Sequence, residues 1–228
     1  MAILYIVGTP IGNLGDICER ALRILSEVDL ILCEDTRVTK KLLDYYQIKT
    51  PTLSYHRHSK IQKIEYILQL LKEGKNLALV SDAGTPVISD PGNKLIHQIL
   101  ESTGGDPPTI QIIPVPGPSA LTAAASISGF PMDKFLFLGF PPTKKKRKKF
   151  FEEIINSKYP VIFYESPYRI IKTLNELKMV NDKLSVVVCR ELTKKFETIY
   201  RGKVEKVISQ LEKDRVKGEF VVIIESKK

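Results

Sequence analysis

A glycine-rich segment near the start of the chain has the residue types of an anion-binding loop. The apolar run Ile3–Val7 is followed by residues 8–16, GTPIGNLGD, and then by a helical pattern. A strand, a tight glycine turn and a helix N-terminus together offer unpaired backbone amides. The three glycines do not follow the G-x-G-x-x-G spacing of a dinucleotide-binding loop. Because Pro10 removes an amide and Ile11 adds apolar bulk, the loop by itself does not predict a pyrophosphate ligand.

A second segment with chemical potential is a run of six basic residues. The chain of 228 residues has a net charge of +9, and much of that charge is concentrated in the sequence KKKRKK. Such a run is often a solvated helix face, but it also suits phosphates, because each neutralised phosphate releases counterions. The residues are Lys144, Lys145, Lys146, Arg147, Lys148 and Lys149.

The sequence does not have the patterns of a metal-binding protein or of a membrane-spanning protein. Cys18, Cys33 and Cys189 lie far apart without a C-x-x-C pair, and the three histidines close no zinc pattern with them. Two of the histidines stand in the stretch HRH at 56–58, which we interpret as a polar loop. No run approaches the roughly 18 apolar residues of a membrane span, and no secretory leader is recognisable. We therefore expect a cytoplasmic protein without a metal site.

The first half of the chain alternates between strand and helix patterns. Apolar residues at spacings of three and four predict helices around 61–71 and 95–100. Repeated strand–helix units predict a mostly parallel sheet with helices on both faces. The predicted strands are Ile3–Val7, Leu30–Cys33, Pro51–Tyr55, Leu77–Ser81 and Thr109–Ile113.

Each of these five strands is followed by a loop rich in glycine, proline or small polar residues. In parallel α/β sheets, ligands bind beyond the carboxyl ends of the strands. Ordinary turn chemistry explains one or two such loops but not five at one edge, so we predict a ligand site there. The loops are GTPIGNLGD (8–16), EDTR (34–37), HRHS (56–59), DAGTPVISDPG (82–92) and PVPGPSA (114–120).

The proline-rich stretch PVPGPS indicates a domain boundary, because prolines stiffen the chain and interrupt regular structure. We predict an N-terminal α/β domain over 1–115 and a C-terminal mixed α/β domain over 116–228. In the second domain the basic helix is expected to start at Lys144. The last strands, joined by a short ELTKK turn, favour antiparallel pairing.

The motifs GTPIGNLGD, CEDTR, LVSDAGTPVISDPG, VPGPSA, FYESPYR and RELTKKFE occur in this order over almost the whole chain. In this combination the sequence resembles the tetrapyrrole methylase superfamily. It is most similar to the branch that methylates the ribose 2′-hydroxyl of a cytidine in 16S ribosomal RNA of the small subunit. The resemblance implies a homodimer of two-domain chains that bind S-adenosylmethionine in the interdomain cleft.

The resemblance also implies a set of cofactor contacts. S-adenosylmethionine carries a sulfonium cation and no phosphate, so the apolar character of the first loop becomes understandable. Matched motif by motif, the expected cofactor-binding residues are Ile11, Gly84, Thr85, Ile88, Ser119, Ala120, Tyr164 and Leu192.

The catalytic candidates follow from the chemistry of methyl transfer. In-line displacement at the methyl carbon needs precise positioning, and a ribose hydroxyl benefits from a base or a cation that lowers its pKa. Among the charged residues after strands, we expect Glu34, Asp35 or Glu191 to accept the proton, and Arg37 or Lys194 to steer the ribose or phosphate. Internal ion pairing is the competing interpretation for each of them.

The resemblance also gives the basic run a partner. We expect Lys144–Lys149 to contact small-subunit ribosomal RNA, free or in the assembled subunit, while Phe150 and Phe151 anchor the far end of the helix. Three alternatives stay open. They are a methyltransferase for a tetrapyrrole, a nucleotide-dependent dehydrogenase, and an RNA-binding module without catalysis.

Overall fold

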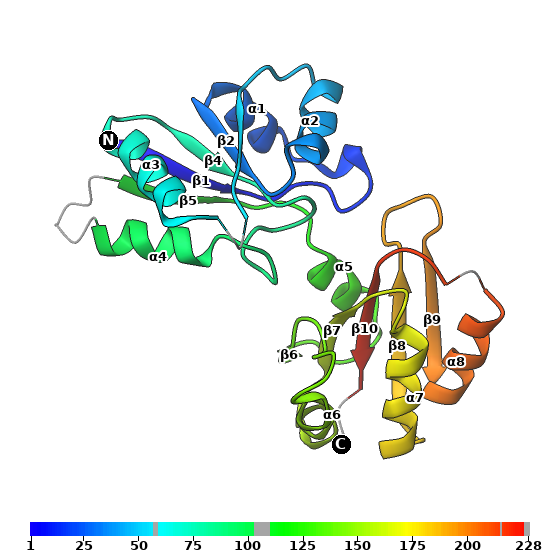
Figure 1. Cartoon of the computed structure of the whole chain (residues 1–228). Helices are drawn as coiled ribbons and strands as arrows, with labels where there is room; N and C mark the ends of the chain where they lie inside the picture. Colours follow the sequence, from blue (N-terminus) through cyan, green and yellow to red (C-terminus); the bar gives the residue numbers. More distant parts are fainter. Residues whose placement is uncertain (57–58, 103–109, 215, 226–228) are drawn as a thin grey trace. The chain divides into compact units, whose positions relative to one another are not determined.

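The computed structural model describes residues 1–56, 59–102, 110–214 and 216–225. The chain divides into two compact units, Met1–Ser119 and Ala120–Lys228, which are described one at a time (Figure 1). His58 and Thr109, which belong to predicted loop and strand segments, lie outside the described residues. Within the described part of the chain, no helix is long and apolar enough to cross a membrane.

The first unit is built on a five-stranded sheet in the order β3-β2-β4-β1-β5. All of its strand pairs are parallel, which confirms the predicted sheet. The carboxyl ends of the strands therefore share one edge. The strands are β1 (Ala2–Val7), β2 (Leu30–Cys33), β3 (Thr52–Ser54), β4 (Leu77–Leu79) and β5 (Ile110–Val115).

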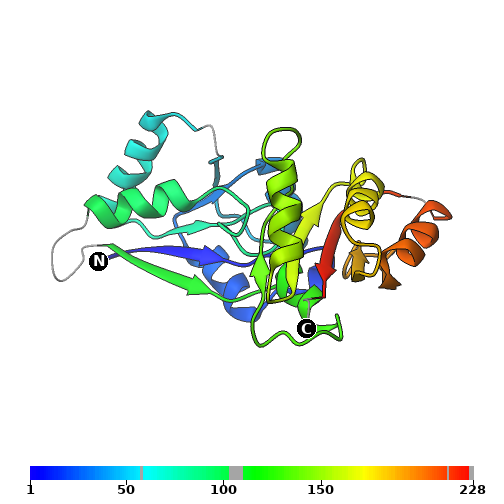
Figure 2. The ribbon, with the colours of Figure 1, turned by 90° about the horizontal axis from the view of Figure 1, so that it is seen from below.

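Helices cover both faces of this sheet. Adjacent residues of β2 point to opposite faces of the sheet. Leu32 belongs to a core shared with α3 and α4, and Ile31 belongs to a core shared with α1 and α2. In Figure 2, α3 and α4 lie on one side of the strands and α1, in blue, on the other. The helices are α1 (Glu19–Glu27), α2 (Thr36–Tyr45), α3 (Ile61–Lys72) and α4 (Asn93–Ser102), with a short 3-10 turn η1 (Leu14–Asp16).

The helical spacing predicted from the sequence holds for the buried positions. Of the apolar positions predicted at spacings of three and four in α3, Ile64 and Leu71 are buried and Leu68 is partly buried. Ile67, which the pattern did not include, is buried as well. Ile61 and Leu100, which the pattern assigned to the same apolar faces, are exposed instead. They lie in the first turn of α3 and the last turn of α4, where the packing against the sheet ends.

Strand β5 continues further than predicted. The sequence indicated an end at Ile113, because proline cannot donate to a sheet. Pro114 and Val115 nevertheless pair with Ile6 and Val7. Since β5 is an edge strand with β1 on one side only, the missing amide of Pro114 costs no sheet hydrogen bond.

The second unit holds a mixed five-stranded sheet in the order β6-β7-β10-β8-β9. Strands β8 and β9 pair antiparallel, as predicted from their short connection, while β10 inserts between β7 and β8. The strands are β6 (Leu136–Phe137), β7 (Val161–Glu165), β8 (Ser185–Arg190), β9 (Thr198–Lys203) and β10 (Phe220–Ile224). Because β6, β7 and β8 run in one direction, their carboxyl ends share an edge.

Three helices bury one face of this mixed sheet, and α5 packs on β7 and β10. The helices are α5 (Ala120–Ser126), α6 (Arg147–Asn156), α7 (Ile170–Val180) and α8 (Val204–Glu212). The expectation that the basic helix starts at Lys144 is wrong. Lys146 has a left-handed backbone, with φ of 67°, so the helix begins at Arg147. Phe150 and Phe151 are buried as expected, but in the first half of α6 and not at its far end.

The loops after β1 and β5 are in direct backbone contact at two glycines, Gly8 and Gly117. A Cβ atom at Gly117 would lie 2.7 Å from the carbonyl oxygen of Gly8, and one at Gly8 would lie 2.9 Å from Cα of Gly117. The Gly8 amide also donates to the Val115 carbonyl at 3.1 Å. Only glycine at both positions allows the two backbones to approach so closely.

We expect Gly117→Ala to lower the free energy of unfolding by about 1–3 kcal/mol, because the added methyl group must push two backbones apart. Urea unfolding of the full chain measures the effect. Gly15→Ala is the matched control, since its Cβ would meet only the Asn13 side chain, at 3.4 Å. Equal midpoints for the two variants would contradict the close contact.

Candidate active site

Three of the post-strand loops in the first unit are joined by backbone contacts. Thr9, after β1, exchanges two hydrogen bonds with Gly84, after β4, at 2.9 and 3.0 Å. The Thr9 hydroxyl donates to the Ser81 carbonyl at 3.3 Å. The Thr85 hydroxyl donates to the Pro118 carbonyl, also at 3.3 Å, which adds the loop after β5. The loops after β1, β4 and β5 thus meet at the carboxyl edge of the sheet.

This meeting point contains several of the predicted cofactor residues. Gly84 has φ of +80°, and a Cβ there would lie 3.3 Å from a methyl group of Ile11. Ile11 is buried, and Thr85 is held against Pro118. Ser119 ends the first unit, next to this loop. Ile88 lies further along the loop after β4 and is exposed.

The remaining predicted cofactor residues belong to the second unit. Tyr164 forms edge-to-face contacts with Phe137 and Phe140, with ring centroids 5.0 and 5.5 Å apart. Leu192 is buried in the loop after β8, and Ala120 begins α5. Tyr164 and Leu192 thus come from β7 and from the loop after β8, whose carboxyl ends share one edge of the mixed sheet.

Glu34, directly after β2, differs from the other acidic candidates. Its side chain is partly buried, and no hydrogen bond to its carboxyl group is found within the described residues. Burial, reinforced by the nearby carboxylates of Asp90 and Asp82, raises the pKa of Glu34 to about 7. A carboxyl group that is half ionised near neutral pH can accept a proton and release it again.

Asp35 and Arg37 form an ion pair with each other. Asp35 is the N-cap of α2, and its carboxylate accepts from the backbone amide of Arg37 at 2.8 Å. The Arg37 guanidinium binds the same carboxylate, at 2.6 Å, and holds the pKa of Asp35 down at about 2. Such a weak base is poorly suited to take a hydroxyl proton. Arg37 itself is exposed, so a further anion can reach it.

Glu191 and Lys194, in the loop after β8, also form an internal cluster. Lys194 contacts Glu191 at 3.0 Å and Glu219 at 2.6 Å. The Glu219 amide donates to the Glu191 carboxylate at 3.0 Å, and a Cβ on Gly218 would overlap that carboxylate. Burial would raise the pKa of Glu191, but the Glu219 amide and Lys194 outweigh it and lower the pKa. Sequence reasoning did not anticipate the Gly218–Glu219 contact, because it joins segments far apart in the chain.

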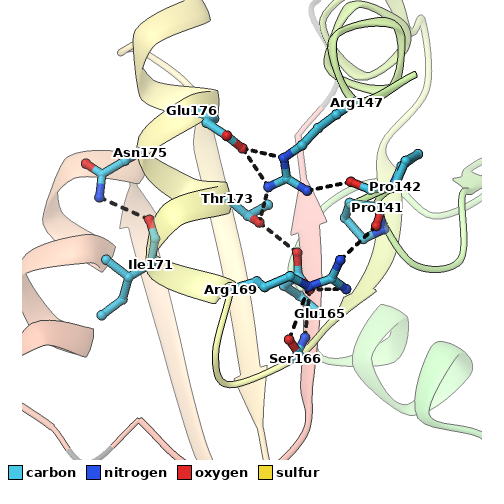
Figure 3. A network of polar contacts seen from close by, with 10 residues as sticks. All are labelled: Pro141, Pro142, Arg147, Glu165, Ser166, Arg169, Ile171, Thr173, Asn175 and Glu176. Atoms are coloured by element: carbon cyan, nitrogen blue, oxygen red, sulfur yellow. Dashed lines mark hydrogen bonds and ion pairs between the residues drawn. The ribbon is translucent and has the colours of Figure 1, made fainter. Parts of the chain in front are cut away.

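A buried polar network in the second unit uses one residue of the basic run. Figure 3 shows Arg147 of α6 pointing toward Glu176 and Thr173 of α7, while Thr173 in turn faces Glu165 at the end of β7. The Arg147 guanidinium donates to Glu176 at 2.8 Å, to Thr173 at 2.7 Å and to the Pro142 carbonyl at 2.9 Å. Its side chain is only 11% exposed. Arg147 is therefore a structural anchor for the loop after β6.

The same network places the other charged residues of FYESPYR. The Glu165 side chain is fully buried and pairs with Arg169 at 2.7 Å. It also accepts from the Thr173 hydroxyl at 2.7 Å, and Arg169 donates to the Pro141 carbonyl at 3.1 Å. These contacts fix the ends of β6 and β7 relative to each other. The five lysines of the basic run, in contrast, are all exposed.

One feature of the first unit was not indicated by residue types. Val87 and residues 89–94 form, together with Glu34, part of the wall of a cavity. Val87 and Ser89 have left-handed backbones, with φ of 76° and 66°, which neither residue type favours. No pattern in a single sequence signals such a conformation. Among the described residues no cluster suited to a metal ion is found.

The site thus combines tightly joined glycine loops with a carboxyl group of raised pKa at one sheet edge. A match to the family model for tetrapyrrole (corrin/porphyrin) methylases covers residues 3–208. The chain belongs to this family. The assignment confirms the predicted class of enzyme, a methyltransferase that uses S-adenosylmethionine.

Curated members of the tetrapyrrole methylase family match along the whole chain. The protein named ribosomal RNA small subunit methyltransferase I from Thermotoga maritima is 46% identical over 227 residues, which is 100% of each chain. The protein of the same name from Escherichia coli O157:H7 is 44% identical over 229 residues, covering 99% of this chain and 78% of its own length.

Solved structures of tetrapyrrole methylase type confirm the two-domain α/β fold. A cobalt precorrin-4 methyltransferase superposes with a TM-score of 0.68 at 19% identity, over 98% of this chain and 94% of its own. A diphthine synthase reaches a TM-score of 0.72 at 13% identity, over 99% and 90%. At these identities the likeness concerns the fold alone.

We expect Arg147→Gln to lower the free energy of unfolding by about 2 kcal/mol, because Glu176 and Thr173 lose a charged partner in a largely buried place. Lys148→Gln, one residue further along α6, is the matched control. Its ammonium is exposed and lies 3.9 Å from Glu152, so its loss should change stability by less than about 0.5 kcal/mol. Thermal unfolding compares the two, and equal stabilities would contradict the anchoring role.

Proposed function

We propose that this chain methylates the ribose 2′-hydroxyl of a cytidine in small-subunit (16S) ribosomal RNA. The observation that carries the proposal is full-length similarity, at 44–46% identity, to proteins named ribosomal RNA small subunit methyltransferase I. The 2′-hydroxyl and the cytidine come from the motif resemblance described above. The proposed setting is the cytoplasm, and the proposed assembly is a homodimer.

The residues present fit S-adenosylmethionine. The joined loops of the first unit offer a buried isoleucine, hydroxyl groups and backbone. In the second unit, Tyr164 is an aromatic residue of the type that suits a sulfonium cation. When bound, S-adenosylmethionine supplies an electrophilic methyl group on sulfur. The proposed contacts are Ile11, Gly84, Thr85, Ile88, Ser119, Ala120, Tyr164 and Leu192.

Glu34 is the proposed proton acceptor. Attack by a ribose hydroxyl forms an O–CH3 bond, breaks the S–CH3 bond and leaves a proton on the hydroxyl oxygen. Of the three acidic candidates, Glu34 has the raised pKa and forms no ion pair with any residue that the structure describes, whereas Asp35 and Glu191 are held ionised by cations and amides. Arg37 and Lys194 are the proposed cations that steer the ribose or phosphate of the substrate. The Arg37 guanidinium is exposed, and Lys194 stands in the loop after β8, where it binds Glu219.

The test of the proposal is methyl transfer from labelled S-adenosylmethionine to small ribosomal subunits that lack the modification. Label is expected in 16S RNA at the 2′-oxygen of a cytidine, identified by nuclease digestion and mass spectrometry. A porphyrinoid substrate is offered in parallel. Label in the porphyrinoid and none in RNA would overturn the proposal.

Glu34→Gln should reduce kcat by about 10²-fold or more, the usual contribution of a general base. In the wild type, kcat should rise with pH through about 7, as Glu34 loses its proton. The variant should lack this rise. A variant that keeps both the rate and its pH dependence would exclude Glu34.

Stability provides the control for that variant. The pKa of Glu34 is raised by folding, so the protonated form stabilises the folded chain at low pH and this stabilisation is lost as pH rises through about 7. Glu34→Gln should therefore be at least as stable as the wild type at pH 8. Lower stability of the variant at pH 8 would show that lost activity reflects unfolding.

The exposed lysines of the basic run are the proposed contacts to RNA. Replacement of Lys144, Lys145, Lys148 and Lys149 by glutamine should weaken binding to small subunits and flatten the salt dependence by about 0.7–0.9 per lost phosphate contact. The affinity for S-adenosylmethionine should not change. A control with equal net charge replaces four other exposed lysines, Lys40, Lys72, Lys206 and Lys213. Equal salt slopes for the two variants would contradict this assignment.

A further inference from the structure

The first unit contains a cavity of about 770 Å³ that the cofactor contacts do not use. It lies where β2 and β3 end and α4 begins. The polar groups that line it include Glu34, His56, Ser59, Asp90, Asn93 and Lys94. Its volume falls within the roughly 300–1,000 Å³ of small-molecule sites, so it has room for one nucleotide but not for a duplex.

The wall of this cavity depends on an unusual backbone. Val87 and Ser89 adopt left-handed conformations, and Gly92 has φ of +137°. A Cβ at Gly92 would lie 2.8 Å from the Val87 side chain and 2.9 Å from Leu79. Backbone strain of this kind persists where the surrounding structure enforces it, and it clusters at binding sites. The loop is therefore held in a costly shape that opens a space beside Glu34.

The cavity carries charges of both signs. Glu34 and Asp90 are acidic, whereas Lys94 stands in the first turn of α4. The Ile96 amide donates to the Gly92 carbonyl, so the amides before it, at 93–95, belong to the positive end of the helix. A simple dianion would be repelled by the two carboxyl groups, and a simple cation by Lys94. The matching ligand has an anionic part and a part rich in hydrogen-bond donors.

We propose that this cavity receives the target nucleotide of the RNA, unpaired and turned out of its helix, with its phosphate at Lys94 and its ribose at Glu34. The inference rests on the proposed function and adds a place for the substrate. A cytidine fits the charge pattern, because its phosphate is anionic while its 2′-hydroxyl and amino group are donors that carboxylates accept. Enzymes that act on one nucleotide commonly take it out of the stack in this way.

Two variants of α4 test the cavity. Asn93 is the exposed first residue of the helix, and Asn93→Trp should fill the cavity without changing the charge. It should reduce kcat/KM for small subunits at least tenfold, whereas Asn175→Trp, at an exposed position of α7 outside the cavity, should stay within about threefold of the wild type. Lys94→Gln should raise KM about tenfold, the effect of losing one charged hydrogen bond. Lys72→Gln, an exposed lysine at the end of α3, is the matched control.

The affinity for S-adenosylmethionine, measured by calorimetry, should be the same in all four variants. Wild-type kinetics from Asn93→Trp and Lys94→Gln, with an active wild-type enzyme, would overturn the cavity assignment and leave the proposed function intact. A wild-type enzyme that labels no ribosomal RNA would instead overturn the proposed function. If Asn93→Trp unfolds at a lower temperature than the wild type, its kinetics are set aside. An unchanged KM of Lys94→Gln then overturns the cavity assignment, and a tenfold rise supports it.

Discussion

The contact between Gly8 and Gly117 is the constraint on which the first unit depends. Two loops that leave adjacent strands touch through bare backbone, and no side chain can be inserted between them. With these loops fixed, Thr9 can pair with Gly84, and Thr85 can reach Pro118. The loops after three strands thereby become one rigid rim. In the proposed cofactor site, the contacting groups of these loops are thus positioned before a methyl donor binds, and positioning is the main requirement of an in-line displacement.

Several charged residues of the two units are held in internal contacts, whereas Glu34 is the one acidic candidate whose pKa is raised. Lys194 joins Glu191 to Glu219, and Arg147 is consumed by Glu176 and Thr173. Each of these charged groups has a partner of opposite charge, which favours its ionised form. Burial and two neighbouring carboxylates disfavour the ionised form of Glu34, and no cation offsets them among residues 1–56, 59–102, 110–214 and 216–225. The burial that makes the ionised carboxylate unfavourable for folding also raises its pKa to the range of a general base at neutral pH.

Much of the fold could be predicted because it rests on local patterns. Periodic apolar residues such as Ile64 and Leu71 indicate burial directly, and glycine and proline mark the loops. The internal use of Arg147 could not be predicted, because its partners on α7 are about thirty residues away and a run of basic residues resembles a solvated surface. The left-handed backbone at Lys146, which delays the start of α6, is likewise not signalled by its residue type.

The acidity of Glu34 shows why the site needs the whole unit. Asp82 and Asp90, which raise its pKa, come from the loop after β4, whereas Glu34 follows β2. Strands β2 and β4 are neighbours only because the chain crosses over through α2, β3 and α3. The left-handed residues Val87 and Ser89 lie between these two aspartates, in the loop that also lines the cavity. One loop with two left-handed residues therefore both raises the pKa of Glu34 and lines the cavity beside it. The two proposed roles, proton acceptance by Glu34 and substrate binding in the cavity, thus depend on the same segment.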